Sequence, residues 1–291
     1  MAIDSSRSPA PAAAVAETAA DITIRPLVSL AEFKACVDLQ QEVWGEEYGD
    51  AIPASLLHVV AHVGGIIAGA FAADGELVGF VFGLTGIRDG GIVHWSHALG
   101  VRESARNAGV GRMLKHYQRA ELARRGVSTL YWTFDPLMAK NAHLNLNRLG
   151  ARVVEYVENM YGTTSSPLHH GLATDRLIVS WSTNPESVRS NGSSPVEAMS
   201  ARTRLILTPD PHAGDALAHL DSPDRPAALL IEVPADIQRV TSHATVAMWH
   251  AAIRANFQWA LRNGYSVSGL HRDQSSGRSF YVLQLGSSTP S

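Results

Sequence analysis

Cysteine is nearly absent from this chain of 291 residues, which contains only Cys36. A single thiol excludes an internal disulfide and any metal cluster built on several cysteines. Cys36 lies in an expected helix, and no neighbour in sequence would activate it, so we interpret it as a buried, unreactive thiol. Because such cysteine usage suits a reducing compartment, we expect a cytoplasmic protein.

The chain also lacks an excess of positive charge and any long apolar run. Its formal charge is −3, so it has no basic field that would attract nucleic acid. No segment approaches the roughly 18 to 20 apolar residues that cross a membrane. Residues 1–20 are rich in Ala, Pro and Ser without an apolar core, which favours a disordered tail over a targeting peptide. We therefore expect neither nucleic acid nor a membrane as a partner.

Apolar residues are plentiful: 45% of the chain is hydrophobic and 18% is charged, enough for a sizeable core. The length suits one large domain or two. Residues 183–201 change in composition to Asn, Pro, Ser and Gly, which is typical of a linker. We predict an α/β domain over 21–182, a linker over 183–201 and a smaller α/β unit over 202–287.

Periodicity and turn residues predict the order of the elements. Before the linker, the expected strands are 22–27, 65–72, 77–84, 92–101, 128–134, 153–157 and 177–181. The expected helices there are 31–44, 53–60, 110–126 and 137–149. After the linker, we expect strands at 203–207, 228–233, 265–271 and 279–285, and a long helix that ends at Gly264.

A glycine-bearing turn follows the strand 92–101 and precedes a helix. Gly109 and Gly111 let the backbone approach a diphosphate, and the first turn of a helix presents free N–H groups to an anion. Arg106 and Arg112 add cations. The Arg-x-x-Gly-x-Gly pattern is weak alone, and a plain strand-to-helix turn is an equal alternative. It is neither a nucleoside-triphosphatase phosphate loop nor a dinucleotide fingerprint, whose spacings differ.

The run Leu99-Gly-Val101, followed by Arg106-Asn-Ala-Gly109-Val-Gly111, resembles motif A of the GNAT acyltransferases. The order of elements over roughly 22–182 also fits this superfamily. The segments 132–151 and 156–162 are similar to a branch of predicted bacterial acetyltransferases with a C-terminal extension, so the resemblance covers nearly all of the chain after residue 21. It implies an α/β (α+β) fold with a mixed, splayed central sheet, an acyl-CoA such as acetyl-CoA as co-substrate, and no metal.

The resemblance also implies which residues hold the cofactor. The pantetheine arm would bond the backbone of the fourth strand, and N–H groups of 107–112 would take the pyrophosphate. Asn141 lies near the start of the helix after the fifth strand, where the family often has an Asn; Asn145 is a weaker candidate. The expected cofactor-binding residues are Leu99, Gly100, Val101, Arg106, Asn107, Ala108, Gly109, Val110, Gly111, Arg112 and Asn141.

His97 is our candidate for the base that takes a proton from the acceptor amine. Strand alternation puts it on one face with Leu99 and Val101, and histidine titrates near working pH. The run 97–101 also resembles the matching strand of arylalkylamine N-acetyltransferases, where histidines do this work, although the second histidine position is Trp95 here. A strand histidine bonded to a backbone partner is the alternative. His94, on the opposite face, is a weaker candidate.

The group that protonates the departing thiolate is where the sequence departs from the family. Many GNAT enzymes carry a Tyr four residues before the glycine that closes the helix after the fifth strand, and Leu146 occupies that position. Tyr156 or Tyr161 could substitute from the next strand, although a core aromatic is the alternative for each. Water is a third source of the proton.

Other polar residues carry weaker signals. Glu46, Glu47 and Asp50 could hold the acceptor amine, but acids in a loop are usually solvated. His169-His170 is more typical of a loop pair than of a metal site.

We therefore expect an N-acyltransferase that moves an acyl group from CoA to a small-molecule amine, with the α-amine of an amino acid as one candidate. The alternatives are a non-catalytic acyl-CoA-binding protein and an interaction protein built on the same scaffold. The sequence does not fix the oligomeric state, and a homodimer stays open.

Overall fold

The computed structural model describes residues 21–45, 49, 51–162, 171–184, 203–206 and 225–286, with the backbone alone for 203–206. The chain divides into two compact units. Unit 1 comprises Met1–Leu84 and Ala98–Glu121, and unit 2 comprises Thr85–His97 and Leu122–Ser291. The strand β4 (Gly91–Val101) contributes residues to both units.

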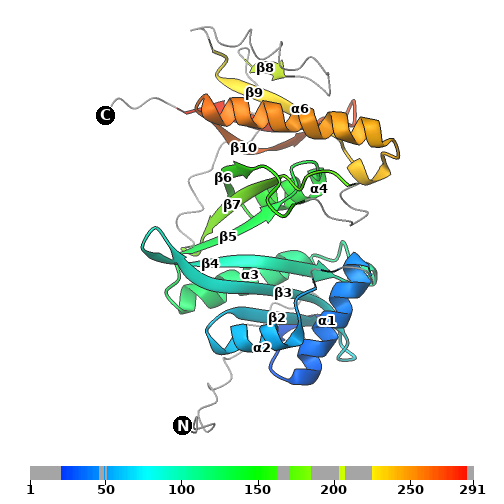
Figure 1. Ribbon diagram of the computed structural model, residues 1–291, viewed down its shortest axis with the longest axis vertical. Coiled ribbons are helices and arrows are strands. Elements are labelled where there is room, and N and C mark those ends of the chain that lie inside the picture. Colours follow the sequence, from blue (N-terminus) through cyan, green and yellow to red (C-terminus); the bar gives the residue numbers. More distant parts are fainter. Residues whose placement is uncertain are drawn as a thin grey trace. The chain divides into compact units, whose positions relative to one another are not determined.

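Unit 1 contains antiparallel strands with helices on both faces. β1 (Thr23–Pro26) pairs with β2 (Ile66–Phe71), and β2 pairs with β3 (Leu77–Arg88). α1 (Leu30–Trp44) and α2 (Ala54–His62) cover one face of these strands, and α3 (Val110–Arg124) covers the other (Figure 1). A cluster that includes Phe33, Leu57, Phe80 and Phe82 forms the core between the strands and the first two helices.

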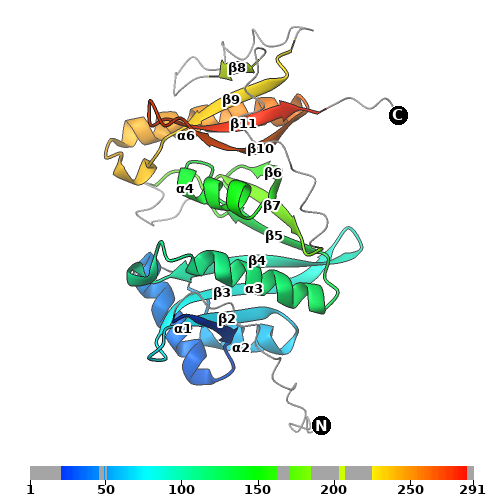
Figure 2. The same cartoon turned by 180° about the vertical axis from the view of Figure 1, so that it is seen from behind.

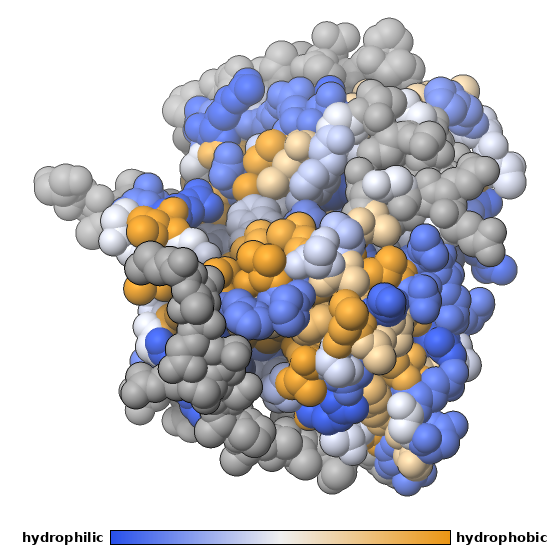
Figure 3. Space-filling view, turned by 60° about the horizontal axis from the view of Figure 1, so that its bottom comes forward, coloured by the Kyte–Doolittle hydropathy of each residue, from blue (hydrophilic) through white to orange (hydrophobic). Residues whose placement is uncertain are grey.

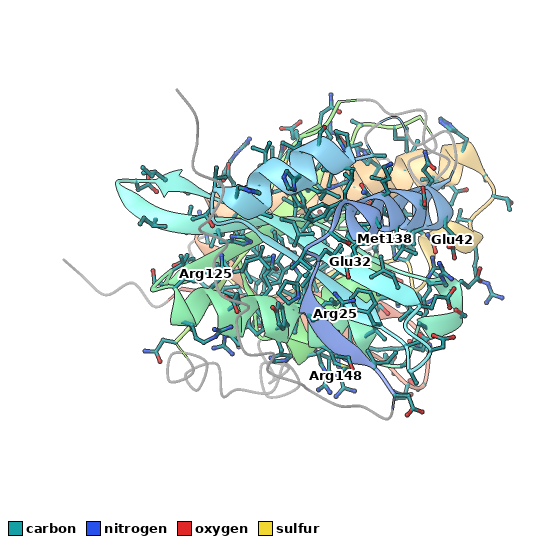
Figure 4. The ribbon with its side chains drawn as sticks, turned by 90° about the horizontal axis from the view of Figure 1, so that it is seen from below. Arg25, Glu32, Glu42, Arg125, Met138 and Arg148 are labelled. Atoms are coloured by element: carbon teal, nitrogen blue, oxygen red, sulfur yellow. The ribbon has the colours of Figure 1, made fainter. Side chains whose placement is uncertain are left out.

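The start of α1 follows directly from its sequence. The Ser29 hydroxyl accepts from the Glu32 N–H at 3.2 Å, and the Glu32 carboxylate accepts from the Ser29 N–H at 3.1 Å, which is a capping box. Arg25 of β1 also binds Glu32 at 2.6 Å (Figure 4). Cys36 is fully buried, as predicted, and burial raises the pKa of its thiol to about 12, which agrees with an unreactive cysteine.

The helix α2 carries apolar residues on both its buried face and its exposed face. Leu57 is buried in the core, whereas Leu56, Val59 and Val63 are exposed. Hydrophobic atoms gather on the face of the molecule that Figure 3 brings forward. In the part of the chain that the structure describes, no helix is long and apolar enough to cross a membrane.

Unit 2 contains the strands β5 (Thr129–Phe134), β6 (Arg152–Val157) and β7 (Arg176–Ser182) of a mixed sheet. β5 is antiparallel to β7, which is antiparallel to β6. Between β5 and β6, α4 (Ala139–Ala142) continues into a π-helix (His143–Arg148). The predicted helix over 137–149 is therefore present, but its second half is wound more widely, with the Leu149 N–H donating to the Leu144 carbonyl five residues back.

The end of the chain forms a separate four-stranded sheet with one long helix. Its strands are β8 (Thr203–Ile206), β9 (Ala228–Val233), β10 (Tyr265–Arg272) and β11 (Ser279–Leu285), in the order β10-β11-β9-β8. β8 runs parallel to β9, and the other pairs are antiparallel. α6 (His243–Arg262) covers one face of this sheet, as Figure 2 shows from behind.

The larger sheet has the order β1-β2-β3-β4-β5-β7-β6, with β4 and β5 parallel and its other described pairs antiparallel. The expected fold class, α+β with a mixed central sheet plus a smaller C-terminal sheet and helix, is confirmed.

Candidate functional site

The glycine turn lies in unit 1, between the end of β4 and the start of α3. A 3-10 turn at Glu103–Ala105 leads into it, and α3 begins at Val110. Asn107 and Gly109 both have left-handed backbone, with φ of 66° and 81°. The Met113 N–H donates to the Gly109 carbonyl at 3.0 Å, which starts the helical bonds. The backbone N–H groups of the helix residues before Met113 have no acceptor within the helix, so they point out of its N-terminus.

Two of the three glycines of this segment are required, each for a different reason. Gly109 requires its left-handed backbone, and a Cβ there would meet nothing within 4 Å. At Gly100 a Cβ would lie 2.6 Å from the ring of Phe80, so packing excludes any larger residue. At Gly111 the nearest atom would be Leu99 Cδ2 at 3.5 Å, an ordinary contact. The space in front of Gly109 is therefore open to a ligand.

Apolar packing fixes the position of the turn. Val110 and Leu114 are buried, and their side chains would lie 3.1 and 3.3 Å from a Cβ at Gly79 of β3. The glycine therefore lets the first turn of α3 approach the sheet closely. Because the helix start is held against a strand, its free amides point in a fixed direction. Such an arrangement binds an anion better than the same amides in a flexible loop would.

Two arginines flank the helix start. Arg106 Nε donates to the Val101 carbonyl at 3.2 Å, which ties the turn back to β4, and both Arg106 and Arg112 are exposed. These cations add to the positive end of the helix dipole, so the turn suits an anion such as a diphosphate. The predicted segment Leu99–Arg112 thus runs without a break from the end of β4 through the turn into the first residues of α3.

The two histidines of β4 lie on opposite sides of the strand in unit 2. His94 is buried, and its Nδ1 lies 3.1 Å from the Thr85 hydroxyl. His97 is exposed, three residues further along. The predicted alternation is confirmed, and the exposed His97 is the histidine that a substrate can reach; its role as base stays a prediction.

The parallel ladder between β4 and β5 is short. It pairs His94 with Leu130 and Trp95 with Tyr131, and β5 runs on to Phe134. Because residues paired in parallel strands share a face, His97 lies on the Trp95 and Tyr131 side. The described pairing of β4 with β5 thus lies within unit 2.

Tyr156 is held by buried contacts with Asp175 and Phe257. Its hydroxyl donates to Asp175 Oδ2 at 2.5 Å, and its ring stacks on Phe257 of α6 with centroids 5.6 Å apart. Burial and the neighbouring carboxylate raise the pKa of the Tyr156 phenol well above its usual value. The phenol therefore keeps its proton, which it shares with Asp175.

Tyr161, five residues further on, lies in a turn after β6 and not in the strand where we expected it. Its side chain is 42% exposed, and its hydroxyl lies 3.2 Å from the hydroxyl of Thr133 on β5. Arg176 stands over its ring at 5.4 Å. Thr133 alternates with the buried Trp132 and Phe134, so the Tyr161 hydroxyl lies on the less buried face of β5, which also carries Tyr131.

The helix after β5 gives its asparagines different environments. Asn141 is exposed at the end of α4. Asn145 is buried, and its side-chain oxygen Oδ1 accepts a hydrogen bond from the indole N–H of Trp132 at 3.0 Å, which favours a structural role. Leu146, at the usual Tyr position, is also buried.

Two contacts that the sequence did not indicate join this segment to the C-terminal sheet. The side chain of Asn147 donates to the Leu270 carbonyl at 2.8 Å and accepts from the Leu270 N–H at 2.9 Å. The buried Tyr281 hydroxyl donates to the Pro136 carbonyl at 2.7 Å. Each pairs residues more than 120 positions apart, so no local pattern could have signalled it.

Lys115 of α3 was also missed. Its side chain is buried, and burial lowers the pKa of its amine to about 7. A lysine in the second turn of an amphipathic helix carries no sequence signal of this kind, because only the folded environment perturbs it.

Glu46, Glu47, Asp50, His169 and His170 lie outside the residues that the structure describes. Among the described residues, no group of three or more His, Cys, Asp or Glu side chains is placed to hold a metal ion.

No protein-family model matches the sequence, and no curated protein matches it. Several solved structures are similar to part of the chain. The ribosomal-protein-S18-alanine N-acetyltransferase from Escherichia coli is 18% identical with a TM-score of 0.45, over 56% of this chain and 94% of that one. A GNAT-family acetyltransferase from Streptococcus pneumoniae is 14% identical with a TM-score of 0.46, over 56% of this chain and 99% of that one.

A third similar structure is a putative acetyltransferase from Salmonella typhimurium with its cofactor acetyl-CoA. It is 16% identical with a TM-score of 0.44, over 57% of this chain and 96% of that one. These likenesses concern the fold alone, and the rest of this chain is an additional region.

Proposed function

We propose that this protein is an acyl-CoA-dependent N-acyltransferase, which transfers acetyl or another acyl group to the amine of a small molecule. The observation that carries the proposal is the turn before α3. It combines an open, left-handed Gly109, a helix start packed against β3, and two exposed arginines. No phosphate loop or dinucleotide fingerprint accounts for this arrangement.

In this proposal, the amides of residues 107–112 and the side chains of Arg106 and Arg112 hold the pyrophosphate. The backbone of Leu99–Val101 and the side chain of Asn141 contact the pantetheine arm. Bound acyl-CoA supplies an activated acyl group on a leaving thiol. The chain itself has to bind, orient and move protons.

Two side chains would move the protons. His97 takes the proton that the amine loses as the C–N bond forms. Tyr161 gives its hydroxyl proton to the sulfur as the C–S bond breaks, and solvent returns a proton from His97 to Tyr161. We choose Tyr161 over Tyr156 because the Tyr156 hydroxyl is buried and bonded to Asp175, whereas Tyr161 is exposed.

The test measures thiol release from acetyl-CoA and from larger acyl-CoA donors against a panel of small amines, including amino acids. We expect turnover with at least one pair, and we expect His97→Ala to lower kcat by ~10²–10⁴. His62→Ala, which changes an exposed histidine of α2, is the matched control and should keep the wild-type rate.

A rate unchanged by His97→Ala would remove His97 from the mechanism. Binding of CoA without turnover on any amine would instead favour a non-catalytic acyl-CoA-binding protein, a reading that the buried Leu146 at the usual Tyr position supports. Absence of CoA binding would contradict both.

A further inference from the structure

The turn that carries Tyr161 is held by one threonine, Thr174, which lies just before β7. The Met160 N–H donates to the Thr174 carbonyl at 3.0 Å, and the Tyr161 N–H donates to the Thr174 hydroxyl at 2.9 Å. That hydroxyl donates in turn to the Gly162 carbonyl at 2.9 Å. The Thr174 N–H donates to the Asn159 side chain at 3.2 Å. The backbone around Tyr161 therefore depends on where Thr174 sits.

The next residue, Asp175, is locked by the C-terminal helix. Its side chain is 2% exposed, and it accepts from Arg254 Nε at 2.8 Å and from a terminal nitrogen of Arg254 at 2.6 Å. It also accepts from the Asn159 N–H at 3.0 Å and the Tyr156 hydroxyl at 2.5 Å, and His250 Nε2 lies 3.6 Å away. One carboxylate thus joins the Tyr161 turn, β6 and α6.

Arg254 holds the Asp175 carboxylate in place with two hydrogen bonds. Burial alone would raise the pKa of Asp175, but the hydrogen bonds from Arg254 and Tyr156 outweigh it and hold that pKa below its ordinary value. A two-pronged arginine–carboxylate pair fixes both distance and orientation, which a single hydrogen bond does not. His250 adds a second tie, since its Nε2 lies 2.9 Å from the Ala173 carbonyl just before Thr174.

We infer that α6 of the C-terminal region is a positioning element for the active site: Arg254, acting through Asp175 and Thr174, sets the place of the Tyr161 hydroxyl on β5. This inference rests on the proposed function, in which Tyr161 donates the proton to the leaving thiolate. Arg254 is a positioning residue and touches no substrate. The C-terminal region is then part of the catalytic unit and not a separate binding module.

The alternative is that the pair serves stability alone, and the chain offers a matched control. Arg278 forms the same two-pronged pair with Glu232 inside the C-terminal sheet, with Nε 2.6 Å from Glu232 Oε1. Neither partner has a described contact with the Tyr161 turn. The changes Arg254→Lys and Arg278→Lys each keep the charge and lose the planar fork.

The first measurement needs no catalysis. Amide hydrogen exchange over residues 159–162 and 174–175 is followed in the full-length protein without ligand. We expect Arg254→Lys to speed exchange in this segment by at least about fivefold, and Arg278→Lys to leave it unchanged, because the amide acceptors of the turn depend on Asp175. Equal exchange in the two variants would overturn the inference even if no substrate is ever found.

The second measurement is a double-mutant cycle on kcat. Tyr161→Phe removes the donated proton, and Asn159→Gly gives a milder loss of the turn, since glycine accepts the left-handed backbone of Asn159. We expect Arg254→Lys and Asn159→Gly each to lower kcat by about tenfold with the KM for acyl-CoA unchanged. In the Tyr161→Phe background, both effects should shrink to less than about twofold, because the group they position is gone.

Equal effects of Arg254→Lys with and without Tyr161 would overturn the positioning role. A wild-type kcat in Tyr161→Phe would instead overturn the acid assigned under the proposed function, while the exchange result would still test the link from α6 to the turn. A fall in kcat for Arg278→Lys as large as for Arg254→Lys would assign the effect to general stability and contradict the inference.

Discussion

The turn before α3 and the network around Asp175 contrast two ways in which this chain builds a polar site. The turn is exposed, and it is formed by residues within about a dozen positions of one another. The network is buried, and it joins β6, the residues just before β7 and a helix almost 80 residues away. From this difference we expect substitutions in the turn to change ligand binding with little effect on stability, and substitutions in the network to lower stability.

The sharpest way to break this contrast is to change Asp175. The change Asp175→Asn removes the buried carboxylate that pairs with Arg254 and leaves it only the half-exposed Glu158 at 3.3 Å, so it should lower the free energy of unfolding by about 3 kcal/mol near neutral pH. The folded-state pKa of Asp175 is depressed, so its stabilisation is present above the unfolded pKa of about 4 and is lost as pH falls through the folded value. Urea unfolding at several pH values should therefore show the variant and the wild type converging in acid.

Asp273→Asn is the control for that experiment, because the Asp273 carboxylate accepts hydrogen bonds from Ser275 and Ser276 of its own surface turn. Its loss of stability should be much smaller. A cost at Asp175 no larger than at Asp273 would show that the network does not hold the fold.

The second change tests the turn. Gly109→Asp puts a carboxylate in front of the helix start, and we expect CoA to bind about 100-fold more weakly, which is about 2.7 kcal/mol. Gly75→Asp is a matched control, since Gly75 also has a left-handed backbone in open space, in the β2–β3 hairpin. Both variants carry the same backbone strain, so thermal unfolding should report similar stabilities. A shared loss of CoA affinity would mean that strain, and not the anion site, is responsible.

The smallest effect separates the two tyrosines. Tyr156→Phe keeps the ring stacked on Phe257 and loses the bond to Asp175, so we expect a loss of about 2 kcal/mol in unfolding free energy. Its kcat should stay within about threefold of wild type. Tyr161→Phe should do the reverse, with kcat lower by about 10² and little change in stability. Rates and urea unfolding measured on both variants test this. The opposite pattern would make Tyr156 the proton donor and Tyr161 the structural residue.

Much of the fold could be predicted because its signals are local. The Ser29–Glu32 capping box and the alternation of β4 follow from neighbouring residues, and the glycine turn was located for the same reason. The assignment of Tyr161 over Tyr156 could not be made, because it depends on where β6 ends and on the burial of Tyr156 against α6, and neither is a local signal.

The π-helical winding also escaped prediction. Over residues 143–148, it buries Asn145 and Leu146 and turns Asn147 toward Leu270, which an α-helical alignment does not anticipate. Gln40 shows the same limit on a smaller scale. It interrupts the apolar stripe of α1 because its buried amide pairs with the backbone of Ile52.

The central claim is that the turn before α3 holds the pyrophosphate of an acyl-CoA. Calorimetric titration with CoA and, separately, with pantetheine tests it most directly, because pantetheine lacks the pyrophosphate and nucleotide. We predict that CoA binds at least about 100-fold more tightly than pantetheine, and that Gly109→Asp removes most of this difference. Equal affinities for the two ligands in the wild-type protein would contradict the account.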